Sequence, residues 1–146
     1  MKRIKRLSVA NKPFDEAQYN ADDNAKYDII SWLERNRFTA WVNPDQYGID
    51  VLADRDGDRY GFEVEVKHNW QGDQFPYSTV HFSARKQKFI GWNHFFTMLN
   101  DERTCVLVVD EAALRASPVV EKATKFTEAE LFIAVPKKAC VIFRLN

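Results

Sequence analysis

Apolar and charged residues alternate along the chain between residues 60 and 68. Successive side chains of a β-strand point to opposite faces, so this period of two predicts a strand with one apolar face. The opposite face carries Glu63, Glu65 and Lys67. Burying two carboxylates and an ammonium is costly unless they are paired or bind a metal, so this face is a candidate functional site.

A second strand is expected over 48–54, joined to the first by the turn-forming pair Asp56-Gly57. A two-residue turn at this pair places Asp50 opposite Glu63, with Glu65 as the diagonal neighbour on the same face. A loop centred one residue later instead places Asp50 directly opposite Glu65. In both registers the carboxylates converge on a small patch.

Periodicity and turn signals predict the remaining elements. Apolar residues at helical spacing predict an amphipathic helix over 22–37, and a second helix is expected over 84–99. Strands are expected at 38–42, 79–82 and 104–109, with a helical turn at 111–116 and a hairpin formed by 131–135 and 139–145. Together these elements predict an α/β fold: a mixed central sheet with a helix on either side, closed by a C-terminal β-hairpin.

Length and composition predict a single domain with one hydrophobic core rather than several domains. The 146 residues are expected to form a single domain, with a basic, flexible arm at 1–20, a core at about 20–110 and a C-terminal extension at 111–146. Lys and Arg number 21, as do Asp and Glu, so the zero net charge argues against a histone-like DNA binder. No signal peptide or long apolar stretch is present, which predicts a cytoplasmic protein without membrane contact.

The paired strands resemble a known group of enzymes. Gly48-Ile49-Asp50, a hairpin and then Glu65-Val66-Lys67 are similar to the motif of the PD-(D/E)xK nuclease superfamily, which includes restriction enzymes, Holliday junction resolvases and phage nucleases. The resemblance covers about residues 20–110 and implies a restriction-endonuclease-like αβββαβ core. The size and aromatic content of the chain are typical of a bacteriophage product, which implies the host cytoplasm as its location.

The resemblance also implies a reaction and its residues. Asp50, Glu65 and the backbone carbonyl of Val66 would bind Mg²⁺, for which Mn²⁺ can substitute, and Lys67 would position the attacking water. The implied activity is metal-dependent hydrolysis of DNA phosphodiester bonds, preferably as an endonuclease and as a homodimer, with no small-molecule cofactor. The alternative is a catalytically idle nucleic-acid-binding or interaction protein with the same fold.

Three further acidic residues compete for the metal. Asp22 falls on the apolar stripe of the first helix, where it serves either as a ligand or as the N-cap of that helix. Glu63 is a rival or a supplement to Glu65, but the Glu-x-Lys spacing selects Glu65. Asp45 is the rival of Asp50, although its position before Gln46-Tyr47-Gly48 indicates a turn.

Basic and aromatic residues further along the chain are candidates for binding nucleic acid. Arg85, Lys86 and Lys88 open the expected helix after Ser83, its expected cap, and form a candidate site for backbone phosphates. Trp70, Phe75 and Tyr77 lie in the expected loop 69–77, where they either stack on bases or cover an edge of the core.

Overall fold

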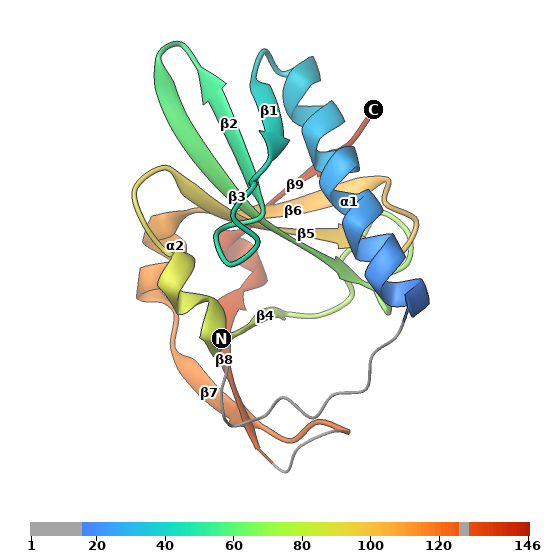
Figure 1. The fold of residues 1–146 in the computed structure, drawn as a ribbon. Coiled ribbons are helices and arrows are strands. Elements are labelled where there is room, and N and C mark those ends of the chain that lie inside the picture. The colour runs from blue at the N-terminus through green and yellow to red at the C-terminus, as the bar shows by residue number, and fades with distance from the viewer. Residues whose placement is uncertain (1–15, 126–128) are drawn as a thin grey trace.

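The fold has three layers (Figure 1). The structure, a computed structural model, describes residues 16–125 and 129–146, and it describes side chains from Asp23 onward within these ranges. Helix α1 (Glu16–Arg35) packs on one face of a six-stranded central sheet, and a three-stranded sheet covers the other face. No helix in these ranges combines the length and the apolar composition needed to cross a membrane.

The central sheet is mixed, with the strand order β1-β2-β3-β5-β6-β9. Strands β3 and β5 run parallel, and every other neighbouring pair in this sheet is antiparallel. The expected α/β class with a mixed central sheet is therefore present. The strand bounds are β1 Thr39–Val42, β2 Val51–Arg55, β3 Asp58–Lys67, β5 His94–Asn100, β6 Cys105–Val109 and β9 Val141–Arg144.

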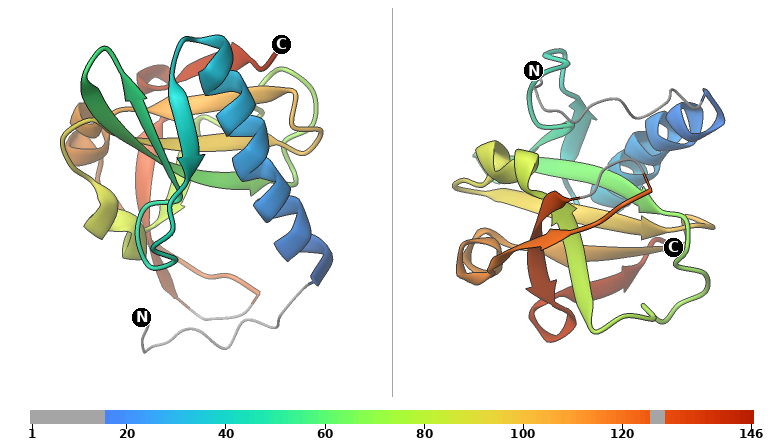
Figure 2. Two further views of the ribbon diagram at one scale, coloured as in Figure 1. Left: turned by 45° about the horizontal axis from the view of Figure 1, so that its top comes forward. Right: turned by 90° about the horizontal axis from the view of Figure 1, so that it is seen from below.

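The small sheet has the order β4-β8-β7 and lies across the central sheet, as the view from below shows (Figure 2). Between the two sheets lies a core whose largest fully buried members include Trp70, Phe82 and Phe96. The remaining bounds are β4 Thr79–Ser83, η1 Ala84–Phe89 (a 3₁₀ helix), α2 Glu111–Ala116, β7 Val119–Lys122, β8 Glu130–Pro136 and η2 Lys137–Ala139 (a 3₁₀ helix).

Helix α1 begins at Glu16, earlier than the sequence pattern indicated. Its residues Ala25, Ile29 and Leu33 lie four apart, so they share one helix face, and all are buried against the central sheet. Asp22 lies inside this helix and therefore cannot be its N-cap, which removes that alternative. The side chain of Asp22 lies outside the described part of the structure, so its role as a ligand stays a prediction.

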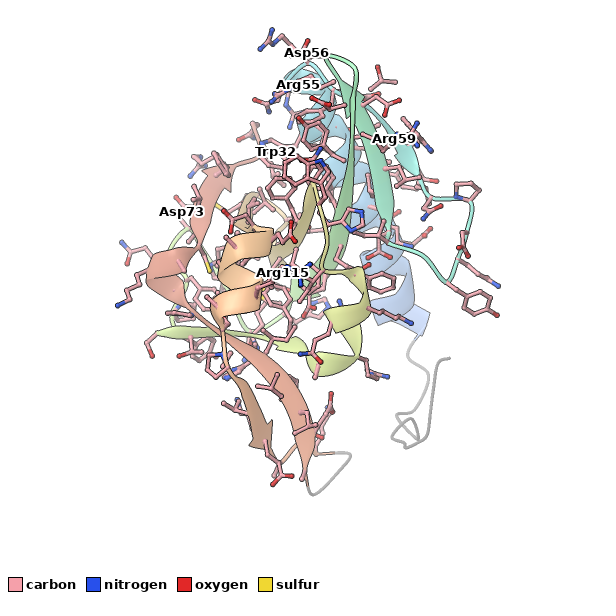
Figure 3. The ribbon with its side chains drawn as sticks, turned by 90° about the vertical axis from the view of Figure 1, so that its left-hand side faces the viewer. Trp32, Arg55, Asp56, Arg59, Asp73 and Arg115 are labelled. Atoms are coloured by element: carbon pink, nitrogen blue, oxygen red, sulfur yellow. The ribbon has the colours of Figure 1, made fainter. Side chains whose placement is uncertain are left out.

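The β2–β3 hairpin has the two-residue turn at Asp56-Gly57. Both turn residues adopt positive φ, 53° and 86°, which is the backbone geometry of the preferred two-residue hairpin turns. The ladder pairs Arg55 with Asp58 and Val51 with Phe62. Arg55 and Asp56 lie at the tip of the hairpin (Figure 3). Of the two registers considered from sequence, the one that places residue 50 opposite residue 63 is therefore correct.

The expected helix over 84–99 is wrong. Only Ala84–Phe89 is helical, as the 3₁₀ helix η1, and the chain then enters strand β5 at His94. Asn93 has a φ of 60°, a left-handed conformation that does not continue a helix. From residue 96 onward the strand is buried on both faces: Phe96 packs in the core between the two sheets and Leu99 in the core beneath α1. Burial on both faces hides the period of two that marks a half-exposed strand.

The expected C-terminal hairpin is also wrong. Strand β8 pairs with β4 and β7 in the small sheet, whereas β9 pairs with β6 at the edge of the central sheet. Ile133 and Val135 of β8 are buried between the two sheets, a position that they would lose by pairing with β9 instead. Pro136 and the 3₁₀ helix η2 carry the chain from one sheet to the other.

Candidate functional site

Asp50 and Glu63 face each other across the β2–β3 ladder. Asp50 lies one residue before β2, and the amide of Asn43 donates to its carbonyl oxygen at 3.0 Å, which extends the β1–β2 pairing. The amide of Asp50 donates to Glu63 Oε1 at 3.3 Å, and the amide of Val64 donates to Asp50 Oδ2 at 2.9 Å. Each carboxylate is therefore held by the backbone of the opposite strand.

A compact loop places Asp50 at this position. Asn43 Nδ2 donates to the carbonyl oxygen of Ile49 at 2.8 Å, which closes the loop just before Asp50. Gly48 lies against the same amide: a Cβ at Gly48 would come within 2.6 Å of Asn43 Nδ2. Glycine is therefore required here by close packing rather than by an unusual φ.

Asp45, the rival of Asp50, makes its hydrogen bond within the loop and not in the site. It is exposed in this loop, and its Oδ1 accepts a hydrogen bond from the amide of Tyr47 at 3.0 Å. Among the described side chains of α1, Lys26 contacts Asp50: its Nζ lies 3.6 Å from Asp50 Oδ1. The structure thus brings together Asp50 and Glu63 and leaves Asp45 apart from them.

Glu63 is the most deeply buried carboxylate in the site. Its residue is 5% exposed, and its backbone carbonyl accepts a hydrogen bond from Thr97 Oγ1 at 2.6 Å. Burial raises the pKa of Glu63 to about 7, the negative charge of Asp50 adds to this shift, and Lys86 opposes it. A cation at this position would favour the ionised form of Glu63.

Lys86 of η1 places its positive charge beside Glu63. Its Nζ lies 3.3 Å from Glu63 Oε2 and 2.9 Å from Glu65 Oε1, so it bridges the two carboxylates. Burial lowers the pKa of Lys86, but Glu65, Glu63 and Asp50 together outweigh this effect and raise it. We call Asp50, Glu63 and Glu65 the acidic cluster.

The three basic residues of η1 face different surroundings. Lys86 turns inward to the acidic cluster, whereas Arg85 and Lys88, which are three apart, are exposed. Ser83 caps this helix as expected, because its Oγ accepts from the amide of Arg85 at 3.4 Å and from Arg85 Nε at 3.1 Å. Sequence reasoning grouped Lys86 with the exposed pair and missed its contact with Glu63 and Glu65.

Lys67 follows Glu65 on the same face of β3 but points to a different environment. Its Nζ lies 5.6 Å from the centre of the Tyr77 ring, and no described carboxylate lies within ion-pair distance of it. It lines a cavity of about 460 Å³, which we call the Lys67 cavity. The lining comprises Lys67, Asn69, Phe75, Pro76, Tyr77, Ser78, Thr79, His81 and Lys122.

His81 enters the Lys67 cavity from β4. Burial lowers its pKa, and the positive charges of Lys122 and Lys67 lower it further. Its ring also meets Phe132 edge-on at a centroid distance of 5.8 Å. A histidine with a lowered pKa is neutral at pH 7 and can both donate and accept a hydrogen bond.

The acidic cluster has the donor atoms that a hard divalent cation requires. Mg²⁺ commonly binds through one or two carboxylates and keeps several waters. Among the side chains that the structure describes, residues 23–125 and 129–146, no three His, Cys, Asp or Glu side chains are already arranged as ligands of one metal. The ammonium of Lys86 lies between two of the candidate carboxylates, so a metal at this position would replace its contacts. With that displacement the residues fit a magnesium site.

Comparison with known proteins adds one solved structure. No protein-family model matches the sequence, and no curated protein matches it. The chain is similar to Hjc, a Holliday junction resolvase from the archaeal hyperthermophile Archaeoglobus fulgidus, with a TM-score of 0.54 and 11% identity over 82% of this chain and 86% of that chain. At this identity the likeness shows a shared fold. The restriction-endonuclease-like fold expected from the hairpin motif is therefore confirmed.

Proposed function

We propose that this protein hydrolyses DNA phosphodiester bonds in a reaction that depends on Mg²⁺. The observation that carries the proposal is the acidic cluster, in which Asp50 and Glu63 are fixed by each other's strands and Glu65 is joined to Glu63 through Lys86. A buried and a half-buried carboxylate that share one ammonium are costly to maintain for stability alone. The fold shared with a resolvase gives independent support.

The acidic cluster would hold the metal. We assign Asp50 and Glu65 as ligands, as the motif implied, and add Glu63 because it lies directly opposite Asp50. The carbonyl of Val66 stays a predicted ligand. Bound Mg²⁺ supplies a water of lowered pKa and a positive charge against the phosphate, and Mn²⁺ can take its place.

Two lysines serve the reaction from different sides of the acidic cluster. Lys86 balances the charge of Glu63 and Glu65 and is within reach of a phosphate placed beside them. Lys67 lies two residues beyond Glu65 on the same face of β3. From the side of the Lys67 cavity it orients the water and contacts the phosphate. Both ammonium groups would stabilise the negative charge that develops during hydrolysis.

The substrate would extend over the exposed start of η1. Arg85 and Lys88 are exposed there and are suited to contact the phosphates on either side of the cut. Because one acidic cluster cuts one strand, cleavage of both strands by an endonuclease would require a homodimer. Mutation of Arg85 or Lys88 should weaken binding and reduce its dependence on salt.

The test is cleavage of supercoiled plasmid and of a four-way DNA junction by Asp50→Asn and Lys67→Ala, with Asp45→Asn as the matched control. Asp45 lies in the same loop as Asp50, and asparagine keeps the oxygen that accepts from Tyr47. We expect Mg²⁺-dependent cutting by the wild type and by Asp45→Asn. Asp50→Asn and Lys67→Ala should retain their folds, measured by circular dichroism, and lose cutting by more than a hundredfold, on the scale reported for losing one preorganised catalytic contact.

Metal binding in crystals and DNA binding in solution separate this proposal from its alternative. Crystals soaked in Mn²⁺ should show anomalous density between Asp50 and Glu65. DNA whose mobility in a native gel is retarded by the protein but which is never cut, with no metal bound at the acidic cluster, would instead identify a catalytically idle binding protein. That binding should weaken as salt increases.

A further inference from the structure

Among the side chains that the structure describes, the Lys67 cavity is lined by two lysines, neutral polar groups and an aromatic wall, and by no carboxylate. Lys67 and Lys122 form no ion pair with any side chain that the structure describes, from Asp23 to Lys125 and from residue 129 onward. Two ammonium groups that face one cavity and have no anionic partner among the described side chains favour a negatively charged ligand. Asn69, Ser78 and Thr79 add amide and hydroxyl groups that can complete the contacts to phosphate oxygens.

One wall of the Lys67 cavity is aromatic. Phe75 is 3% exposed and supports Tyr77 edge-on, with ring centroids 5.6 Å apart. Tyr77 itself is 41% exposed, and its hydroxyl accepts a hydrogen bond from Asn69 Nδ2 at 2.9 Å, which fixes the ring. An immobilised, exposed aromatic ring beside cationic groups is how proteins bind single-stranded nucleotides, through base stacking and phosphate contact.

We propose that the Lys67 cavity binds one unpaired nucleotide of the DNA substrate. Its phosphate would contact Lys122, its base would stack on Tyr77, and Lys67 would lie between this phosphate and the one that is cut. A volume of about 460 Å³ lies within the range of small-ligand sites. A base inside a duplex cannot enter a cavity, so the nucleotide bound here must be unpaired.

The position of the Lys67 cavity links it to the acidic cluster. Lys67 lies two residues beyond Glu65 on β3, a separation of roughly 7 Å along a strand. One nucleotide step can span that distance, so the nucleotide in the cavity would adjoin the phosphate that is cut. This inference rests on the proposed function for its substrate, DNA, and it specifies a substrate class: DNA with unpaired nucleotides beside the cleavage point.

Binding to the Lys67 cavity can be measured without catalysis. Thymidine 5′-monophosphate is titrated in EDTA into ¹⁵N-labelled protein, with thymidine and inorganic phosphate as separate probes. The nucleotide should shift the amide signals of Asn69, Tyr77 and Lys122, and each separate probe should shift them less at equal concentration. Equal shifts from inorganic phosphate would reduce the cavity to an anion site, and absent shifts would remove it as a site altogether.

A pair of DNA substrates tests the requirement for an unpaired nucleotide. Affinity is measured by fluorescence anisotropy in EDTA for a blunt duplex and for the same duplex with a three-nucleotide overhang. Lys122→Ala should weaken overhang binding about tenfold, the effect of losing one charged hydrogen bond, and change blunt binding less than twofold. Lys138→Ala, which removes an exposed lysine of η2 outside the cavity lining, should change neither.

The outcomes separate this inference from the proposed function. If Lys122→Ala lowered the affinity for both duplexes equally, Lys122 would be a general contact to the DNA backbone. That result would overturn the nucleotide site, whether or not the protein cuts DNA. A loss of affinity for the overhang duplex alone would support the nucleotide site even if no Mg²⁺-dependent cutting were found. Tyr77→Leu provides a second variant: it removes stacking but keeps both lysines, and it should also weaken overhang binding selectively.

Discussion

The amide of Asp50 donates a hydrogen bond to the Glu63 carboxylate, and the amide that follows Glu63 donates one back to the carboxylate of Asp50. This reciprocal pair joins the loop before β2 to the middle of β3. The two carboxylates are therefore held in place by backbone amides. A metal that binds them would not have to order either side chain, which lowers the cost of binding.

The raised pKa of Glu63 should make the stability of the protein depend on pH. Its pKa is about 7 in the folded state against an ordinary value of 4.5, so the stabilising neutral form is present below pH 4.5 and is lost as the pH rises through 7. Glu63→Gln stays neutral throughout. Relative to the wild type, this variant should therefore gain roughly 3 kcal/mol of unfolding free energy between pH 4.5 and pH 8.

Urea unfolding of both proteins in EDTA at several pH values measures this difference. Glu121→Gln, an exposed carboxylate of β7, is the control and should track the wild type. A gap between Glu63→Gln and the wild type that stays constant with pH would contradict the raised pKa.

Lys86 and a metal should stabilise the same carboxylates. Lys86→Met leaves Glu63 and Glu65 without their bridging ammonium, so it should lower the unfolding free energy by about 3 kcal/mol in EDTA. Mg²⁺ should restore more stability to this variant than it adds to the wild type, because no ammonium competes for the site. Thermal unfolding with and without Mg²⁺ measures both effects. Lys88→Met on the same 3₁₀ helix should behave as the wild type does.

Gly48 should control the position of Asp50. A Cβ at residue 48 would lie 2.6 Å from Asn43 Nδ2, so Gly48→Ala should displace Asn43 from Ile49 and shift the loop. We expect Mn²⁺ affinity, measured by calorimetry, to fall about tenfold.

Gly57→Ala is the comparison for this experiment. Nothing lies within 4 Å of a Cβ there, but the φ of 86° strains any other residue, so this variant should lose about 1 kcal/mol of stability and keep its metal affinity. Equal metal affinities for the two alanine variants would show that Gly48 does not position Asp50.

His81 should report on the charge of the Lys67 cavity. Lys122→Ala removes one of the two charges that lower its pKa, so that pKa should rise. It should remain below its ordinary value because burial, the largest cause, is unchanged. Proton NMR of the imidazole during a pH titration measures the shift, and Lys138→Ala should leave it unaltered. An unchanged pKa in Lys122→Ala would place Lys122 too far from His81 to line the same cavity.

The hairpin could be predicted from sequence because its determinants are local. Asp56-Gly57 selects the turn, and the turn selects the register that sets Asp50 opposite Glu63. The second helix could not be predicted correctly, because residues 96–100 are buried on both faces and their pattern is set by two separate cores. Local signals fix turns, whereas burial on both faces depends on distant parts of the chain.

The partners within the site were harder to predict. Lys86 contacts Glu65 across 21 positions of sequence, and its neighbours Arg85 and Lys88 give no sign that it alone turns inward. Lys122 joins the Lys67 cavity through β7, a strand that the sequence pattern did not predict. Tertiary packing brings these residues together, so the composition of the cavity became visible only with the fold.

The parallel pairing of β3 with β5 has a consequence for how the chain folds. The connection between them, residues 68–93, passes through β4 and therefore through the other sheet. Parallel pairing across so long an excursion is a non-local event, which makes folding slow. During synthesis on the ribosome, β3 would emerge with one edge unpaired until β5 follows, and that interval is when the nascent chain is most prone to aggregate.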